Sequence, residues 1–132
     1  GPAPLARASL AGALARQADR AGAESGLTAT FAVRGTPRPL AVRAEVVLLR
    51  IGQEALANVR KHAAAGTATV ELYYREDGVR LEVSDDGAGF DQAAASDGFG
   101  LRGMRARLAE IGGALTVRTA PGRGTTITAE VP

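Results

Sequence analysis

The chain has 132 residues, of which 45% are hydrophobic and 23% charged, and its formal net charge is +2. This length suits one domain with a single core. The absence of cysteine excludes disulfides and thiolate zinc sites, and one histidine cannot form a histidine metal cluster. With only 4% aromatic residues, we do not expect a nucleic-acid-binding module. No apolar run reaches the length of a membrane span and no basic-then-apolar leader is present, so we expect neither a span nor a secretion signal.

The first two residues, Gly1 and Pro2, are typical of the scar that protease removal of a fusion tag leaves. We therefore expect residues 3–132 to form the domain, as an excised fragment of a larger protein.

Hydrophobic periodicity predicts three helices and five strands. The helices are expected at about residues 5–23, 43–64 and 101–111, and the strands at 27–33, 67–75, 79–85, 114–119 and 125–131. Residues 86–99 show no hydrophobic periodicity, which predicts a loop. Long hairpins with helices on one face only predict an α+β two-layer sandwich on a mixed five-stranded sheet, and not a doubly wound sheet.

The long helix carries a group of polar residues outside its apolar arc. Glu54, Asn58 and Lys61 lie together there, with His62 at the border, and Lys61 is the only lysine in the chain. One interpretation is a solvated face with Glu54 and Asn58 one turn apart. The other is a site where an amide or carboxylate oxygen binds a hard cation and the ammonium group binds phosphate. Helix geometry alone leaves both open.

Two adjacent carboxylates end the strand at 79–85, in the stretch SDDGAGF. Because side chains alternate along a strand, Asp85 continues the apolar face and Asp86 belongs to the polar side. A carboxylate held toward a core is costly unless it is hydrogen-bonded. Asp85 therefore either lies at a rim with water or meets a group with N–H donors. Asp-Gly also favours a hairpin turn, although no strand follows, and the acids do not fit an EF-hand.

The stretch GFGLRG, from Gly98 to Gly103, matches the dinucleotide-binding pattern literally. A loop precedes it instead of a strand, which excludes a Rossmann site, and the chain has no Walker A motif. What remains is a helix start after glycine, whose free N–H groups favour an anion. Thr125 shares a face with the apolar residues of the last strand, so its hydroxyl also faces the core layer. Together these features predict a pocket.

Four ordered motifs resemble those of GHKL ATPase domains. They are QEALANVRKHA (Gln53–Ala63), DDGAGF, GFGLRGM and PGRGTT. The chain resembles specifically the catalytic ATP-binding domain of sensor histidine kinases, over about residues 5–132. Within these kinases, the residues of the first motif and the stretch GLRGMRARLAEIGG resemble those of the nitrate-sensor type of kinase, which is common in actinobacteria.

The resemblance implies an adenine pocket. In it Asp85 accepts a hydrogen bond from the exocyclic amine of adenine, Thr125 assists through water, and Gly87 and Gly89 line the pocket. Gly98 and Gly100 would end a mobile lid of about residues 90–99 and place the next helix at the phosphates. Leu101 is carried over as a nucleotide-binding residue.

The resemblance also implies roles for the polar residues of the long helix. Asn58 would ligate Mg²⁺, and Lys61 and His62 would contact phosphate or ribose. Glu54 corresponds to an acid that activates water in hydrolytic members. In the kinases it would orient the acceptor or a water molecule.

The implied activity is transfer of the γ-phosphoryl group of ATP to a histidine on a separate dimerisation domain, upstream of a response regulator. The acceptor motif is missing here, so we expect binding of Mg-ATP without autophosphorylation, by a monomeric, cytoplasmic domain that contacts no membrane. Whether the full-length protein is membrane-anchored stays open. The alternatives are an anti-sigma-factor serine kinase of the same fold and a non-catalytic nucleotide-binding module.

Overall fold

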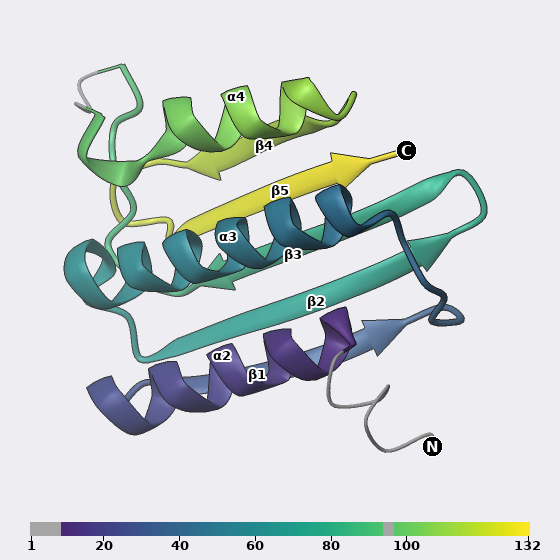
Figure 1. Ribbon diagram of the computed structural model, residues 1–132. Coiled ribbons are helices and arrows are strands. Elements are labelled where there is room, and N and C mark those ends of the chain that lie inside the picture. The colour runs from purple at the N-terminus through teal and green to yellow at the C-terminus, as the bar shows by residue number, and fades with distance from the viewer. Residues whose placement is uncertain (1–8, 94–96) are drawn as a thin grey trace.

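The structure, a computed structural model, describes residues 9–93 and 97–132 (Figure 1). The predicted tag scar, the first residues of the first predicted helix and the middle of the predicted lid lie outside the described residues. Within them are three α-helices: α2 (Leu10–Ser25), α3 (Val42–Asn58) and α4 (Leu101–Glu110). A π-helical turn, η1 (Val59–Ala63), continues α3, and a 3-10 turn, η2 (Asp97–Phe99), precedes α4. The strands are β1 (Thr28–Arg34), β2 (Thr67–Arg75), β3 (Gly78–Asp85), β4 (Ala114–Thr119) and β5 (Thr125–Val131).

Within the helix predicted at about residues 5–23, the structure describes a helix start at Ser9. Ser9 has an extended backbone, and its Oγ accepts a hydrogen bond from the Gly12 N–H at 3.0 Å. This is the geometry of an N-cap, so α2 starts at Leu10. The prediction of one helix running on from residue 5 is therefore wrong at Ser9.

The five strands form one mixed sheet in the order β1-β2-β3-β5-β4. The β1–β2 pair is parallel and the other pairs are antiparallel. All three α-helices lie on the same face of the sheet (Figure 1). The predicted α+β two-layer sandwich is confirmed, because the helices face the apolar side of the strands and leave the other side uncovered.

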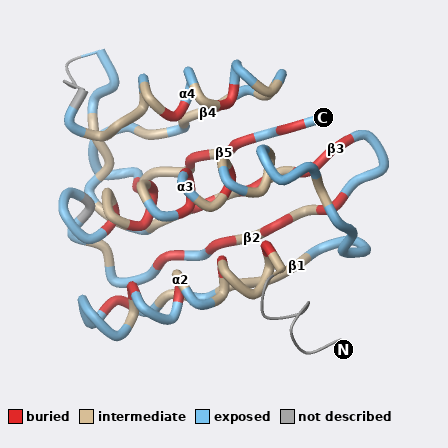
Figure 2. Tube along the Cα trace, in the orientation of Figure 1, coloured by how far each residue is buried: buried red, intermediate tan, exposed pale blue. Residues whose placement is uncertain are grey.

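The core lies between the helices and the sheet, and its buried residues alternate along the central strands (Figure 2). On α3 the buried side chains include Leu48, Ile51 and Ala55, which belong to the predicted apolar arc. Among the described residues, no helix is both long and apolar enough to span a bilayer.

Sheet register positions the two polar strand ends that matter for the site. Asp85, the last residue of β3, pairs with Thr125, the first residue of β5. Both residues therefore lie at the same end of the two inner strands β3 and β5, beneath the C-terminal end of α3 and η1.

Candidate functional site

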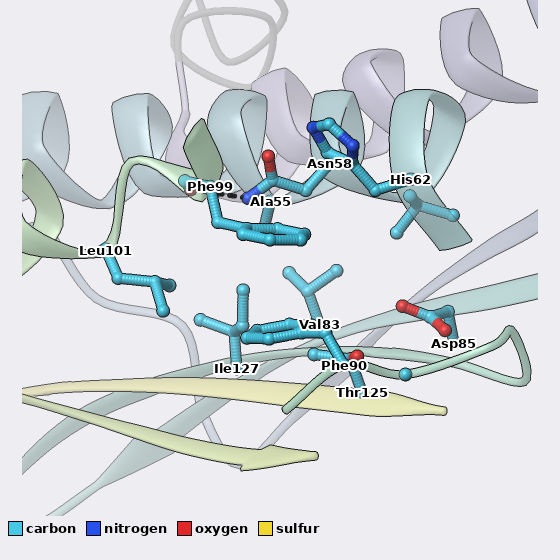
Figure 3. A pocket seen from close by; sticks show the side chains of 12 residues that line it. Ala55, Asn58, His62, Val83, Asp85, Phe90, Phe99, Leu101, Thr125 and Ile127 are labelled. Atoms are coloured by element: carbon cyan, nitrogen blue, oxygen red, sulfur yellow. Dashed lines mark hydrogen bonds between the residues drawn. The ribbon is translucent and has the colours of Figure 1, made fainter. Parts of the chain in front are cut away.

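A pocket lies between the end of α3 with η1 and the edge where β3 ends and β5 begins (Figure 3). Its walls are mostly apolar, with a few polar side chains. Its lining residues are Ala55, Asn58, Val59, His62, Val83, Asp85, Gly89, Phe90, Phe99, Leu101, Thr125 and Ile127.

Asp85 is a half-buried carboxylate at one end of this pocket (Figure 3). Its Oδ1 accepts a hydrogen bond from the Gly87 N–H at 2.8 Å. Burial raises the pKa of the Asp85 carboxyl above its ordinary value of 3.8, and the neighbouring Asp86 adds to this. The N–H groups of Gly87 and Thr125 act in the opposite direction and hold the pKa lower. The prediction that Asp85 faces the core layer is thus consistent with its place in the pocket.

Asp86 is exposed, and its side chain bonds to the backbone at the start of β2 instead of lining the pocket. Its Oδ1 accepts hydrogen bonds from the N–H groups of Gly66 and Thr67, both at 2.9 Å. The Thr67 N–H is the largest cause that lowers the pKa of the Asp86 carboxyl. The sequence placed Asp86 on the solvent side, but it did not indicate that this side chain ties the end of β3 to the start of β2.

Thr119 connects the pocket to the loop that follows β3. Its Oγ1 donates to the Gly124 carbonyl at 3.0 Å and accepts from the Phe90 N–H at 3.0 Å. It also lies 2.9 Å from Thr125 Oγ1. A hydroxyl has one donor and two acceptor positions, so in this last bond Thr125 donates. The Thr125 hydroxyl can then still accept a hydrogen bond from another group.

Two phenylalanine rings fill the middle of the pocket, and the His62 ring lies beside them on the side of η1 (Figure 3). Phe90 and Phe99 stack with ring centroids 4.1 Å apart and planes 14° apart, and His62 lies 4.6 Å from Phe99. The stack leaves a free volume of about 20 Å³, enough for about one water molecule. Neither phenylalanine was predicted as a site residue from the sequence. Two of the three phenylalanines in the chain lie in the glycine-rich motifs, and this was the signal that could have found them.

Two side chains of α3 contact η2 and α4. Asn58 Nδ2 donates to the Phe99 carbonyl at 2.7 Å, which orients the amide oxygen Oδ1 away from that bond. One turn earlier, Glu54 Oε1 lies 3.2 Å from Arg107 Nη1. Arg107 is a further residue that the sequence analysis did not single out.

The structure brings six of the predicted site residues together in the pocket lining: Asn58, His62, Asp85, Gly89, Leu101 and Thr125. The others surround it. Lys61 is exposed on η1, Gly98 lies in η2, and Gly100 is the N-cap of α4 with a φ of 70°. Gly87 meets Asp85 through its N–H, and Glu54 lies against Gly100.

With the Phe90–Phe99 stack opened, the arrangement would suit a flat ligand that carries both an amine and an anionic group. The apolar slot ends at a carboxylate, which accepts hydrogen bonds from an amine. Near its other end lie an amide oxygen and the N-terminus of α4, whose free N–H groups favour an anion. Among the described residues, no group of three or more acidic, histidine or cysteine side chains could hold a metal ion by itself.

Comparison with known proteins identifies this arrangement. The model of the family "Histidine kinase-, DNA gyrase B-, and HSP90-like ATPase" matches residues 44–132. The sensor histidine kinase LiaS of Bacillus subtilis is 46% identical over 87 residues, which are 64% of this chain and 24% of LiaS. The histidine-protein kinase/phosphatase DegS of Brevibacillus brevis is 42% identical over 89 residues, 67% of this chain and 23% of DegS. The chain thus spans about a quarter of the length of these relatives.

Solved structures share the fold over nearly the whole chain. The full-length ShkA structure in complex with AMPPNP matches with a TM-score of 0.76 and 27% identity, over 94% of this chain and 30% of ShkA. The histidine kinase domain of Erythrobacter litoralis EL346 matches with a TM-score of 0.71 and 22% identity, over 93% of this chain and 64% of that one. The chain therefore belongs to the histidine kinase-, DNA gyrase B- and HSP90-like ATPase family, as the ATP-binding catalytic domain of a sensor histidine kinase.

Proposed function

We propose that the pocket binds Mg-ATP with its adenine at Asp85, and that the domain donates the γ-phosphoryl group to a histidine on a separate dimerisation domain. The half-buried Asp85 carboxylate carries this proposal, because it lies at the end of an apolar slot. The exocyclic amine of adenine supplies a hydrogen-bond donor for the carboxylate. A water molecule held by the Thr125 hydroxyl would complete the contacts to the base.

The residues around Asn58 fit a magnesium ion that arrives with the nucleotide. Mg²⁺ prefers oxygen ligands and is commonly bound by one or two protein groups together with substrate phosphates. The bond from Asn58 Nδ2 to Phe99 fixes which atom of the amide faces away, and this atom is the oxygen. Bound Mg²⁺ would neutralise phosphate charge during transfer.

The phosphates would lie at the start of α4, where Gly98, Gly100 and Leu101 surround the helix N-terminus. Lys61 and His62 on η1 would approach them or the ribose from the side of α3. The exposure of Lys61 supports a contact with a charged group of the ligand, since its ammonium group has no place in the apolar slot. The predicted lid of about residues 90–99 would close over this end.

The acceptor would come from another domain of the same kinase, and a response regulator would receive the phosphoryl group afterwards. His62 lines the nucleotide pocket, so it would serve the nucleotide and not accept the phosphoryl group. We further propose a monomeric, cytoplasmic domain of the nitrate-sensor type of kinase with an actinobacterial origin. The resemblance of its first motif and of the stretch after Gly100 supports this type.

Phosphoryl transfer is tested by mixing this chain with the helical dimerisation domain of its own kinase and γ-labelled ATP. We expect label on the histidine of that domain and none on this chain alone. Label on a serine of an antagonist protein would favour an anti-sigma-factor kinase. Nucleotide binding without transfer to any acceptor would favour a non-catalytic module.

The metal role predicts a specific loss in the Asn58→Ala variant. Its affinity for ATP should fall about tenfold in magnesium buffer, as expected for loss of an interaction with a charged group. In EDTA the variant and the wild type should bind ATP alike. Calorimetric titration under both conditions measures this, and an equal loss in EDTA would contradict the role.

A further inference from the structure

An ion pair joins Glu54 of α3, which lies against the N-cap of α4, to Arg107 in the last turn of α4. Arg107 Nη1 lies 3.2 Å from Glu54 Oε1, and the two residues are 53 positions apart in the sequence. Their side chains are 38% and 32% exposed, so both remain within reach of solvent and of a bound ligand. The pair thus links α3 to α4 next to the place proposed for the phosphates.

Two glycines lie against this pair: Gly100, the N-cap of α4, and Gly103 within the helix. A Cβ at Gly100 would lie 2.9 Å from Glu54 Oε2, and a Cβ at Gly103 would lie 3.4 Å from Arg107 Nη1. The Arg107 side chain therefore runs back over Gly103, one turn earlier, toward the start of the helix.

The position of Glu54 raises an electrostatic problem. Its carboxylate lies against Gly100, the N-cap of α4, and no side chain caps this helix through a hydrogen bond. The N-terminus of a helix favours one anion through its N–H groups and dipole. A phosphate that binds at the same place meets a negative charge unless a cation offsets it. Arg107 is the cation that contacts Glu54.

We propose that Arg107 is a positioning residue that holds Glu54 against the first turn of α4 and offsets its charge. The terminal phosphate of ATP and the Glu54 carboxylate can then share this helix end. This inference rests on the proposed nucleotide site. It assigns Arg107 an action through Glu54 and not through direct contact with the nucleotide.

A double-mutant cycle on nucleotide binding tests the proposal, with Mg-AMPPNP and Mg-ADP titrated into this chain by calorimetry. Arg107→Ala should weaken AMPPNP binding about threefold to fivefold, the range of a partly exposed ion pair, and should weaken ADP binding less because ADP carries less phosphate charge. Arg107→Lys should restore most of the affinity. Adding Glu54→Gln to Arg107→Ala should restore it as well, because the repulsive carboxylate is then gone.

The controls separate this inference from the proposed function. Arg105→Ala removes an exposed arginine of the same helix and should leave both affinities unchanged. If Arg107→Ala fails to fold, Arg107→Gln and the double variant provide the same comparison. An equal loss in the single and double variants, or no loss in Arg107→Ala while the wild type binds, would overturn the role of Arg107. Failure of the wild type to bind either nucleotide would instead overturn the proposed site.

Discussion

Asp85 and Asp86 are adjacent in the sequence, yet the folded protein shifts the pKa values of their carboxyl groups in opposite directions. Burial at the pocket raises the pKa of the Asp85 carboxyl, and hydrogen bonds from the start of β2 lower the pKa of the Asp86 carboxyl. A raised pKa means that ionisation of Asp85 is less favourable in the folded state than in the unfolded state. Its charge therefore lowers stability, as is common for groups that serve binding.

The pH dependence of stability should show this for Asp85. Below its ordinary pKa of 3.8 the carboxyl is protonated in both states, and stability is lost as the pH rises through the raised folded pKa. The Asp85→Asn variant avoids this loss. We expect it to melt at a higher temperature than the wild type at pH 7, with the difference shrinking below pH 3.8. A variant that melts lower at pH 7 would contradict the account.

Asp86→Asn provides the matched comparison with the opposite sign. Because the folded pKa of Asp86 is lowered, its carboxylate stabilises the fold above the ordinary value of 3.8, and this contribution is lost as the pH falls through the folded pKa. We expect the variant to melt below the wild type at pH 7 and to approach it in acid. Thermal melts of both aspartate variants, monitored by circular dichroism at pH 7 and below pH 3.8, measure these differences. An Asp86→Asn variant that melts at the same temperature as the wild type at pH 7 would contradict the stabilising role of the Asp86 carboxylate.

The residues of the pocket differ in how far the sequence could predict them. Asp85 follows from strand alternation, because its neighbours Val79, Leu81 and Val83 define the buried face. The aromatic stack and the Glu54–Arg107 pair do not, since each joins residues from different elements whose relative placement depends on the whole fold. A local pattern can single out the two phenylalanines, but it carries no information on which residues contact each other.

The loop after β3 is fixed by the hairpin between β4 and β5. The Gly122 N–H bonds to the Ala88 carbonyl, and a Cβ at Gly89 would overlap the carbonyl oxygen of Ala120. Gly89 also has a φ of 63°, which side chains other than glycine rarely adopt. This close contact brings Gly89 and Phe90 to the pocket.

Substitution of Gly89 should therefore lower the free energy of unfolding by more than backbone strain at a positive φ alone would. Gly122 is a matched control, because its φ is 78° and a Cβ there would meet open space. We expect Gly122→Ala to lower the free energy of unfolding by about 1 kcal/mol. Gly89→Ala should lower it by about 2 kcal/mol more, because the overlap forces the two loops apart. Urea unfolding of both variants measures this, and equal losses would show that the loop contact is not needed.

The elements themselves were predicted well where their patterns are strong. The strands at 114–119 and 125–131 match β4 and β5, because strict alternation bounded by a glycine-rich turn leaves little freedom. The helix at 43–64 was predicted as one element, whereas α3 ends at Asn58 and a π-helical turn follows. The two helix types differ by one residue in their hydrogen bonding, and no composition pattern distinguishes them.

On the scale of the molecule, the mixed sheet is what gathers the motifs into one site. The pairing of β3 with β5 brings Asp85 to Thr125, although 40 positions separate them, and α3 lies across this pair. The sequence predicted a mixed sheet but not the strand order, because pairing between distant strands depends on packing over the whole core. This order places the polar ends of β3 and β5 beneath Asn58 and His62.

Adenine recognition by Asp85 is the central proposal for this domain, and one titration tests it. Mg-ADP and Mg-IDP are titrated into the wild type and into Asp85→Asn; inosine carries an oxygen where adenine carries the exocyclic amine. We expect the wild type to prefer ADP by at least about tenfold, in line with the loss of a hydrogen bond to a charged group, and the variant to lose this preference. Equal binding of both nucleotides by the wild type, or an unchanged preference in Asp85→Asn, would contradict the account.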